Sequence, residues 1–247
     1  MLKLIKYELR KQWFSKLFIL IVMGILEVTF LFGLLSDDRD TISISVGISV
    51  LVAFTAIMFV SFECIMTYSK DLKTKQSYML FLTPNSTYKI VGAKVITSVA
   101  QIGITAAFMA GVIFANITAV MLRYQDIEKM MEIIQNTIRD VMGLNIDYGL
   151  LLIGLIAFLL EWISKVIMGI LAITLSATFL SNTKGKGIVS LIIFFIINYS
   201  VGKIGKLLMQ ESMLIFEQLM IDAIFMAFVI AVFYFATAWM LDKKVSV

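Results

Sequence analysis

The chain lacks histidine altogether, and it has one cysteine and one proline in 247 residues. Without histidine it can form neither a histidine metal site nor a histidine proton relay. The lone cysteine, Cys64, excludes an internal disulfide, and we expect it to be a small buried side chain near the end of an apolar run. No repeat or low-complexity tract divides the sequence. These absences predict a single domain.

Charge is scarce as well. Only 15% of the residues are charged and 60% are hydrophobic, with a mean hydropathy of +0.97, whereas soluble domains are roughly 45 to 50% apolar. A helix needs about 20 mostly apolar residues to cross a hydrocarbon core about 30 Å thick. The sequence therefore predicts an all-α integral membrane protein with six transmembrane helices, at 17–35, 42–66, 90–121, 148–180, 188–201 with its continuation, and 219–241.

The basic residues are distributed unevenly between the two sides of these spans. Of the 21 Lys and Arg residues, fourteen fall on the side of the N-terminus, six fall on the other side, and Lys165 lies within a span. Since cytoplasmic loops carry an excess of Lys and Arg, we expect both termini to be cytoplasmic in a bacterial cell membrane. The bases then face anionic lipid and a cytoplasmic partner, and no nucleic acid is needed to explain them.

Two segments outside the spans are amphipathic. Residues 1–14 place Leu2, Ile5, Leu9 and Trp13 at helical spacing among bases, which predicts an interfacial helix that either anchors the chain or also contacts a cytoplasmic subunit. Residues 123–142 repeat apolar side chains at steps of three and four, which predicts an external amphipathic helix. This second helix would either cover the outer ends of the spans or contact substrate.

The fifth apolar run is interrupted by polar and small residues. They are Asn198, Ser200, Gly202, Lys203, Gly205 and Lys206. Irregular backbone cannot face lipid unless protein or water satisfies it. We therefore expect a broken, partly re-entrant hairpin on the outer side, between the fifth and sixth helices.

A few ionisable residues lie within the spans or at their edges, namely Glu27, Glu63, Glu161, Lys165 and Asp222. Placing a charged group in a bilayer costs free energy, so such groups are usually paired with an opposite charge or hydrated. Glu161 and Lys165 stand four residues apart and can pair along one helix, either as a structural pair or as part of a transport path. Glu63 lies near an inner end, and Asp222 lies close enough to the outer interface to be solvated.

The segment from Tyr68 to Lys94 carries the most specific pattern, and it reads YSKDLKTKQSYMLFLTPNSTYKIVGAK. It resembles the pattern D-x-E-x-G-T-x-x-x-L-L-x-x-P-x-S, followed by a glycine and a lysine, of the ABC-2 type transporter permeases. The positions that match are Asp71, Leu80, Pro84 and Ser86, and then Gly92 and Lys94. Lys73 and Lys75 stand where the family usually has an acid and a glycine.

The resemblance implies a coupling helix at 71–82 that docks on a separate ATPase subunit. Its docking residues would be Asp71, Leu72, Lys73, Thr74, Lys75, Gln76, Ser77, Tyr78, Met79 and Leu80. The sequence has no GxxxxGK[ST] phosphate loop. The resemblance thus implies a non-catalytic permease subunit, one ABC-2 domain over 1–247, whose partner binds the ATP and Mg while this chain holds no cofactor.

The same resemblance extends to the small exporter subunits of Firmicutes that handle amphipathic or antimicrobial peptides. It implies a dimer with a second permease copy or a paralogue, and a path for amphipathic peptides or hydrophobic toxins. Two alternatives remain open. One is a secondary transporter driven by an ion gradient, and the other is an immunity membrane protein that sequesters peptide.

Overall fold

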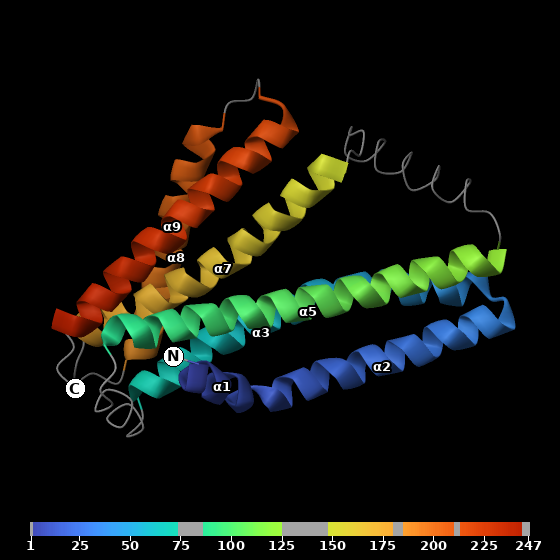
Figure 1. The fold of residues 1–247 in the computed structure, drawn as a ribbon, viewed down its shortest axis with the longest axis horizontal. Coiled ribbons are helices and arrows are strands. Elements are labelled where there is room, and N and C mark those ends of the chain that lie inside the picture. The colour runs from blue at the N-terminus through green and yellow to red at the C-terminus, as the bar shows by residue number, and fades with distance from the viewer. Residues whose placement is uncertain (1, 74–85, 125–147, 180–184, 210–212, 244–247) are drawn as a thin grey trace. The chain divides into compact units, whose positions relative to one another are not determined.

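The computed structural model describes residues 2–73, 86–124, 148–179, 185–209 and 213–243 (Figure 1). Within these residues every secondary-structure element is a helix. They are α1 (Leu2–Lys11), α2 (Trp13–Ser36), α3 (Arg39–Lys73), α5 (Thr87–Tyr124), α7 (Tyr148–Phe179), α8 (Lys186–Leu208) and α9 (Ile215–Lys243). The all-α prediction is confirmed for this part of the chain.

Six of these helices are long and apolar enough to cross a membrane. They are α2, α3, α5, α7, α8 and α9, and the most apolar window of each has a mean hydropathy between 1.9 and 2.6. Each overlaps one of the six predicted runs. The remaining helix, α1, has ten residues, which gives a length of about 15 Å and is too short to span the hydrocarbon core.

The chain divides into two compact units. The first unit comprises residues 1–12, 59–102 and 153–247, and the second comprises 13–58 and 103–152. The long helices α3 and α5 therefore contribute one part to each unit.

Apolar clusters hold the first unit together. Met168, Val201 and Met226 join α7, α8 and α9 in one cluster. A second cluster, formed by Val91, Ala238 and Leu241 with Leu72 packed against it, joins α3, α5 and α9.

A close helix contact adds to the first unit. A Cβ atom built on Gly169 of α7 would lie 2.7 Å from Cδ1 of Ile65 in α3, so a larger residue at this position would force the Ile65 side chain to shift. The sequence does not distinguish this glycine from the others, because the residue that needs the space is about a hundred positions away.

The second unit is organised around the turn between α2 and α3. Phe30, Ile42 and Val120 form its apolar cluster. At the turn, the hydroxyl and N–H of Thr41 and the N–H of Asp40 donate to the carboxylate of Asp38, which caps α3. These bonds stabilise the ionised form and hold the pKa of Asp38 below its ordinary value.

The expected break in the fifth run is wrong, because α8 is one continuous helix. Two of its polar residues, Asn198 and Ser200, form hydrogen bonds without any unwinding of the helix. The hydroxyl of Ser200 donates to the carbonyl of Ile196 one turn earlier at 2.8 Å, and the amide oxygen of Asn198 accepts a hydrogen bond from Lys165 Nζ of α7 at 2.6 Å. Residues 210–212, between α8 and α9, lie outside the described part of the chain.

Two predicted helices fall largely outside the described residues. The coupling helix at 71–82 lies there from residue 74 onward, and the external helix at 123–142 lies there from residue 125 onward. The first residues of both belong to longer helices, since 71–73 form the last turn of α3 and 123–124 end α5.

Candidate functional site

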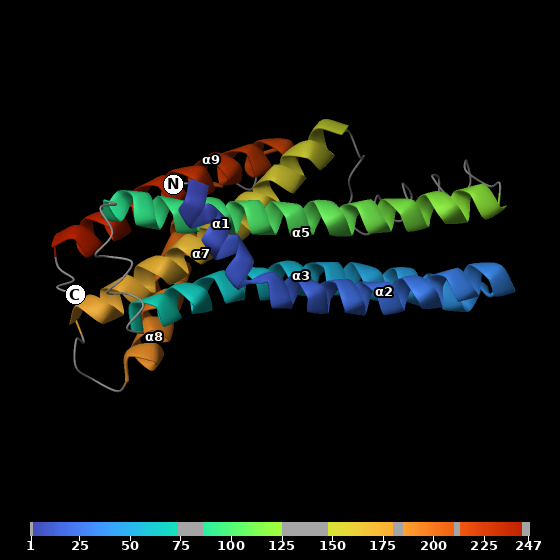
Figure 2. The same cartoon turned by 60° about the horizontal axis from the view of Figure 1, so that its bottom comes forward.

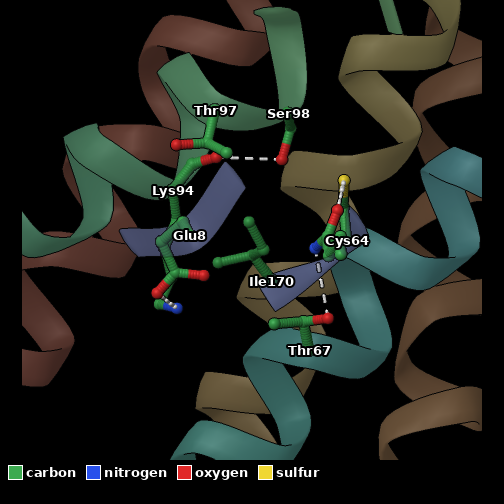
Figure 3. A pocket seen from close by; sticks show the side chains of 8 residues that line it. Glu8, Cys64, Thr67, Lys94, Thr97, Ser98 and Ile170 are labelled. Carbon is green, nitrogen blue, oxygen red and sulfur yellow. Dashed lines mark hydrogen bonds and ion pairs between the residues drawn. The ribbon is translucent and has the colours of Figure 1, made fainter. Parts of the chain in front are cut away.

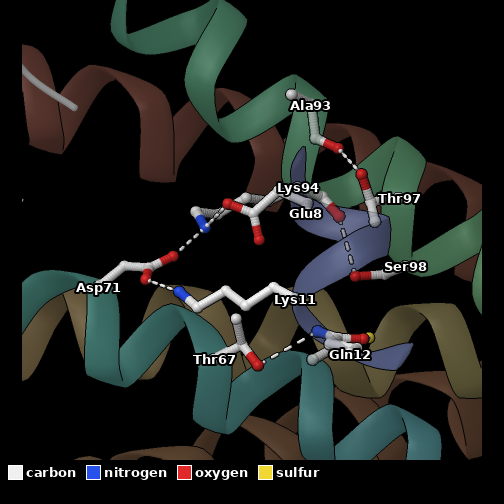
Figure 4. Close-up of polar contacts among 10 residues, drawn as sticks. Glu8, Lys11, Gln12, Thr67, Asp71, Ala93, Lys94, Thr97 and Ser98 are labelled. Atoms are coloured by element: carbon white, nitrogen blue, oxygen red, sulfur yellow. Dashed lines mark hydrogen bonds and ion pairs between the residues drawn. The ribbon is translucent and has the colours of Figure 1, made fainter. Parts of the chain in front are cut away.

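A group of polar side chains, all of them buried except Lys11, joins α1 to the end of α3 and the beginning of α5 (Figure 4). We call this group the polar network; its members are Glu8 and Lys11 of α1, Gln12 directly after α1, Thr67 and Asp71 of α3, and Lys94 of α5. Within the first unit, α1 lies against α5 at this point (Figure 2). In so apolar a chain, buried charges need a specific explanation.

Two lysines and two carboxylates alternate within the polar network. Lys94 Nζ donates to Glu8 Oε1 at 2.8 Å and also to Asp71 Oδ2, while Lys11 Nζ donates to Asp71 Oδ1. The side chains of Glu8, Lys94 and Asp71 are only 5, 6 and 11% exposed. The four formal charges sum to zero, and each buried charge has a partner of opposite sign. Breaking such a pair typically costs about 3 to 5 kcal/mol.

Uncharged side chains, among them Gln12, Thr67 and Cys64, lie beside the charged part of the polar network (Figure 3). Gln12 Nε2 donates to Thr67 Oγ1 at 3.1 Å, and the thiol of Cys64 lies 3.6 Å from the amide oxygen of Gln101. A small cavity lies beside these groups and is lined also by Lys94. Its volume, measured as the space open to the centre of a water molecule, is about 10 Å³, which is close to the minimum for holding one water. Cys64 is 6% exposed, so its predicted burial is confirmed.

The fourth helix at this end, α7, is held by a buried tyrosine. The hydroxyl groups of Tyr68 on α3 and Thr174 on α7 lie 2.6 Å apart and share a hydrogen bond. Lys94 Nζ lies 5.8 Å from the centre of the Tyr68 ring, within range of a cation–π interaction. Tyr68 therefore links α7 to the charged part of the polar network.

The face of α1 that is buried is not the apolar one that the sequence suggests. Glu8 and Gln12 are each 4% exposed, whereas Ile5 and Leu9 are only partly buried. The reason is that α3 and α5 offer charged and hydroxyl partners to α1 at this place. Glu8 and Gln12 were not expected as site residues, and their spacing of one helical turn was the only signal for them in the sequence.

The predicted docking residues separate into three groups. Asp71 is buried within the polar network, and its carboxylate is engaged by two lysines. Leu72 packs against the cluster of Val91, Ala238 and Leu241, and Lys73 ends α3. The others, from Thr74 to Leu80, lie outside the described residues.

A second polar group lies within the long helices of the first unit, near the middle of α7 and α8 and in the first third of α9. Lys165 Nζ is 2.7 Å from Glu161 Oε1 and 2.6 Å from Asn198 Oδ1, so the predicted pair along α7 is confirmed. Asp222 of α9 is partly buried and close enough to interact electrostatically with both Glu161 and Lys165. We call these four residues the mid-helix cluster, and it joins α7, α8 and α9.

Neither group includes the other two intramembrane acids. Glu27 in the second unit accepts a hydrogen bond from Asn116 at 2.9 Å, and Glu63 is partly buried on α3. Among the residues that the structure describes, no three His, Cys, Asp or Glu side chains come together as a metal site would require.

Comparisons with known proteins do not assign the chain. No family model, no curated protein and no solved structure matches it. The resemblance of residues 68–94 to ABC-2 permeases therefore stays a prediction.

Proposed function

We propose that this chain is the transmembrane subunit of an ATP-driven exporter. The observation that carries the proposal is the position of Asp71, the first residue of the predicted docking segment, which is tied by buried ion pairs to α1 and α5. Six long apolar helices support the membrane part of the proposal. The chain would be non-catalytic, and a separate subunit would bind ATP and Mg.

The polar network explains how movement at the docking segment would reach the spans. Displacing the end of α3 alone would separate Asp71 from Lys11 and Lys94, at a cost of about 3 to 5 kcal/mol for a buried pair. It is less costly for α1, α3 and α5 to move together. Closure of the ATPase subunits would then be transmitted as a rigid-body shift of these helix ends.

The cargo and assembly follow from the apolar character of the spans. Few charged side chains interrupt them, which suits amphipathic peptides or other apolar cargo better than ions. The transport path would form between this chain and a second permease, either an identical copy or a paralogue.

Copurification tests the proposal. The tagged chain, extracted gently from its native membrane, should bring with it a phosphate-loop ATPase in stoichiometric amount. Lys75→Glu, in the predicted docking segment, should reduce the recovered ATPase by about tenfold, as expected for a loss of roughly 1.4 kcal/mol of binding energy.

Lys89→Glu is the matched control, because Lys89 is exposed in the first turn of α5 and lies outside the docking segment. It should leave the ATPase yield unchanged. Recovery of the chain alone under conditions that preserve known complexes would refute the exporter proposal.

A gradient-driven transporter is the second candidate, and the mid-helix cluster is the observation that favours it. Two carboxylates, Glu161 and Asp222, lie near one ammonium group, Lys165, and gradient-driven transporters place ionisable groups within their spans. Asp222→Asn would then abolish uptake driven by a pH gradient in proteoliposomes without ATP. Absence of such uptake in the parent protein excludes this candidate.

A further inference from the structure

The free face of α1 carries a separate recognition surface. Lys6, Tyr7 and Arg10 are exposed, and Tyr7 is 57% exposed. Lys6 and Arg10 stand one helical turn apart, and each is two residues from Glu8, which places them about 200° around the helix from it. Lys6 and Arg10 therefore point away from Glu8, and Tyr7 lies at the edge of this face, one turn before Lys11.

The two bases on this face are not neutralised within the described part of the chain. The nearby acids of the polar network, Glu8 and Asp71, are engaged by Lys94 and Lys11. No ion pair joins Lys6 or Arg10 to another residue of the described ranges. The face thus presents two positive charges beside an exposed phenol.

The position of α1 along the chain sets the depth of this face. One residue, Gln12, separates α1 from α2, and α2 is a candidate membrane span from Trp13 onward. Because α1 is too short to span, its bases lie where an apolar helix leaves the hydrocarbon. Tyrosine is enriched at this level, and the excess of bases at the N-terminal side predicts the cytoplasmic leaflet.

We infer that Lys6, Tyr7 and Arg10 form a binding site for the phosphate groups of anionic phospholipids. Arginine recognises phosphate through two parallel N–H···O bonds, and lysine adds a compact charge about 5 to 6 Å away, at the distance between neighbours four residues apart on a helix. The tyrosine ring would lie among the headgroups and upper acyl carbons. Each base near an anionic surface changes affinity by about fivefold.

This site is connected to the end of α3 through the polar network. Glu8, which lies on the opposite face of α1, binds Lys94, and Lys94 binds Asp71. Lipid bound at α1 therefore restrains the position of Asp71. If the proposed exporter function holds, ATPase stimulation will depend on anionic lipid, and this last consequence rests on that proposal.

The test measures lipid binding directly. The full-length chain is delipidated in detergent, and native mass spectrometry follows the binding of added phosphatidylglycerol, with phosphatidylcholine as the neutral comparison. The double variant Lys6→Gln and Arg10→Gln should weaken phosphatidylglycerol binding by about 25-fold, from two steps of about fivefold. Phosphatidylcholine binding should be the same for parent and variant.

The matched control is Lys89→Gln with Lys243→Gln, which removes two exposed lysines outside α1. It should change phosphatidylglycerol binding by less than about twofold. Excess inorganic phosphate should not displace the lipid; displacement would identify free phosphate as the ligand and overturn the lipid assignment. Circular dichroism of each variant must match the parent protein.

If the test pair and the control pair lose phosphatidylglycerol binding equally, the lipid responds only to the overall positive charge of the protein, and the proposal is overturned. The proposal is also overturned if the test pair leaves lipid binding unchanged. Unchanged lipid binding with loss of ATPase copurification would assign the face to a protein partner instead. Lipid binding is measured without the ATPase, so its outcome does not depend on whether the exporter proposal is correct.

Discussion

Replacing Lys94 with methionine removes the cation that Glu8 and Asp71 share, while retaining a side chain of similar length. Asp71 keeps Lys11 as a partner, but Glu8 loses its only ion pair among the described residues, and its side chain is 5% exposed. An unmatched buried carboxylate of this kind should lower the free energy of unfolding by about 3 to 5 kcal/mol.

Unfolding by increasing SDS in mixed micelles measures this loss. The companion variant adds Glu8→Leu to Lys94→Met, which removes the unmatched charge. Replacing both members of a buried pair by apolar groups is often nearly neutral. The double variant should therefore return to within about 1 to 2 kcal/mol of the parent protein.

Lys89→Met serves as the control, because this exposed lysine precedes Lys94 on α5. It should change the free energy of unfolding by no more than about 0.5 kcal/mol. A similarly small effect for Lys94→Met would refute the burial argument. A double variant that is no more stable than Lys94→Met alone would show that Glu8 and Lys94 do not act as a pair.

Three further predictions concern packing and capping. Thr41→Val removes the hydroxyl donor to Asp38 and should raise the pKa of that carboxyl, as NMR of labelled aspartate can measure. Because the pKa of Asp38 is depressed in the folded state, its ionised carboxylate stabilises the fold above the unfolded-state pKa. This stabilisation is lost as the pH falls through the folded-state pKa. Gly169→Ala should destabilise the first unit by about 1 to 3 kcal/mol through overlap with Ile65, and Ile65→Ala in the same chain should recover part of this loss in the same SDS assay. Leu72→Asp should lower the free energy of unfolding by at least about 2 kcal/mol whereas Leu72→Met should cost less than about 1.5 kcal/mol; equal effects would contradict the packing of Leu72 in its cluster.

The sequence predicts the spans well because the cost of exposing polar groups to hydrocarbon acts on every residue of a long run. It does not predict the continuity of α8, because Asn198 is satisfied by Lys165, a residue on another helix. The ion pair between Glu161 and Lys165 could be predicted from the sequence because both residues lie on one helix, four positions apart.

The polar network could be predicted only in part. Asp71 and Lys94 were recognised from the spacing of a family pattern, yet Asp71 was assigned to a docking surface and is buried. Glu8 meets Lys94 across 86 positions of sequence. Only tertiary packing brings such residues together, so their local spacing carries little information about the contact.

The neutrality of the four paired charges in the polar network affects how this part of the molecule responds to an electric field. A single charge that crosses a membrane potential of 100 mV gains or loses about 2.3 kcal/mol. Glu8, Lys11, Asp71 and Lys94 together carry no net charge, so shifting them as one body along the membrane normal does almost no electrical work. Their movement is therefore nearly independent of the voltage across the membrane.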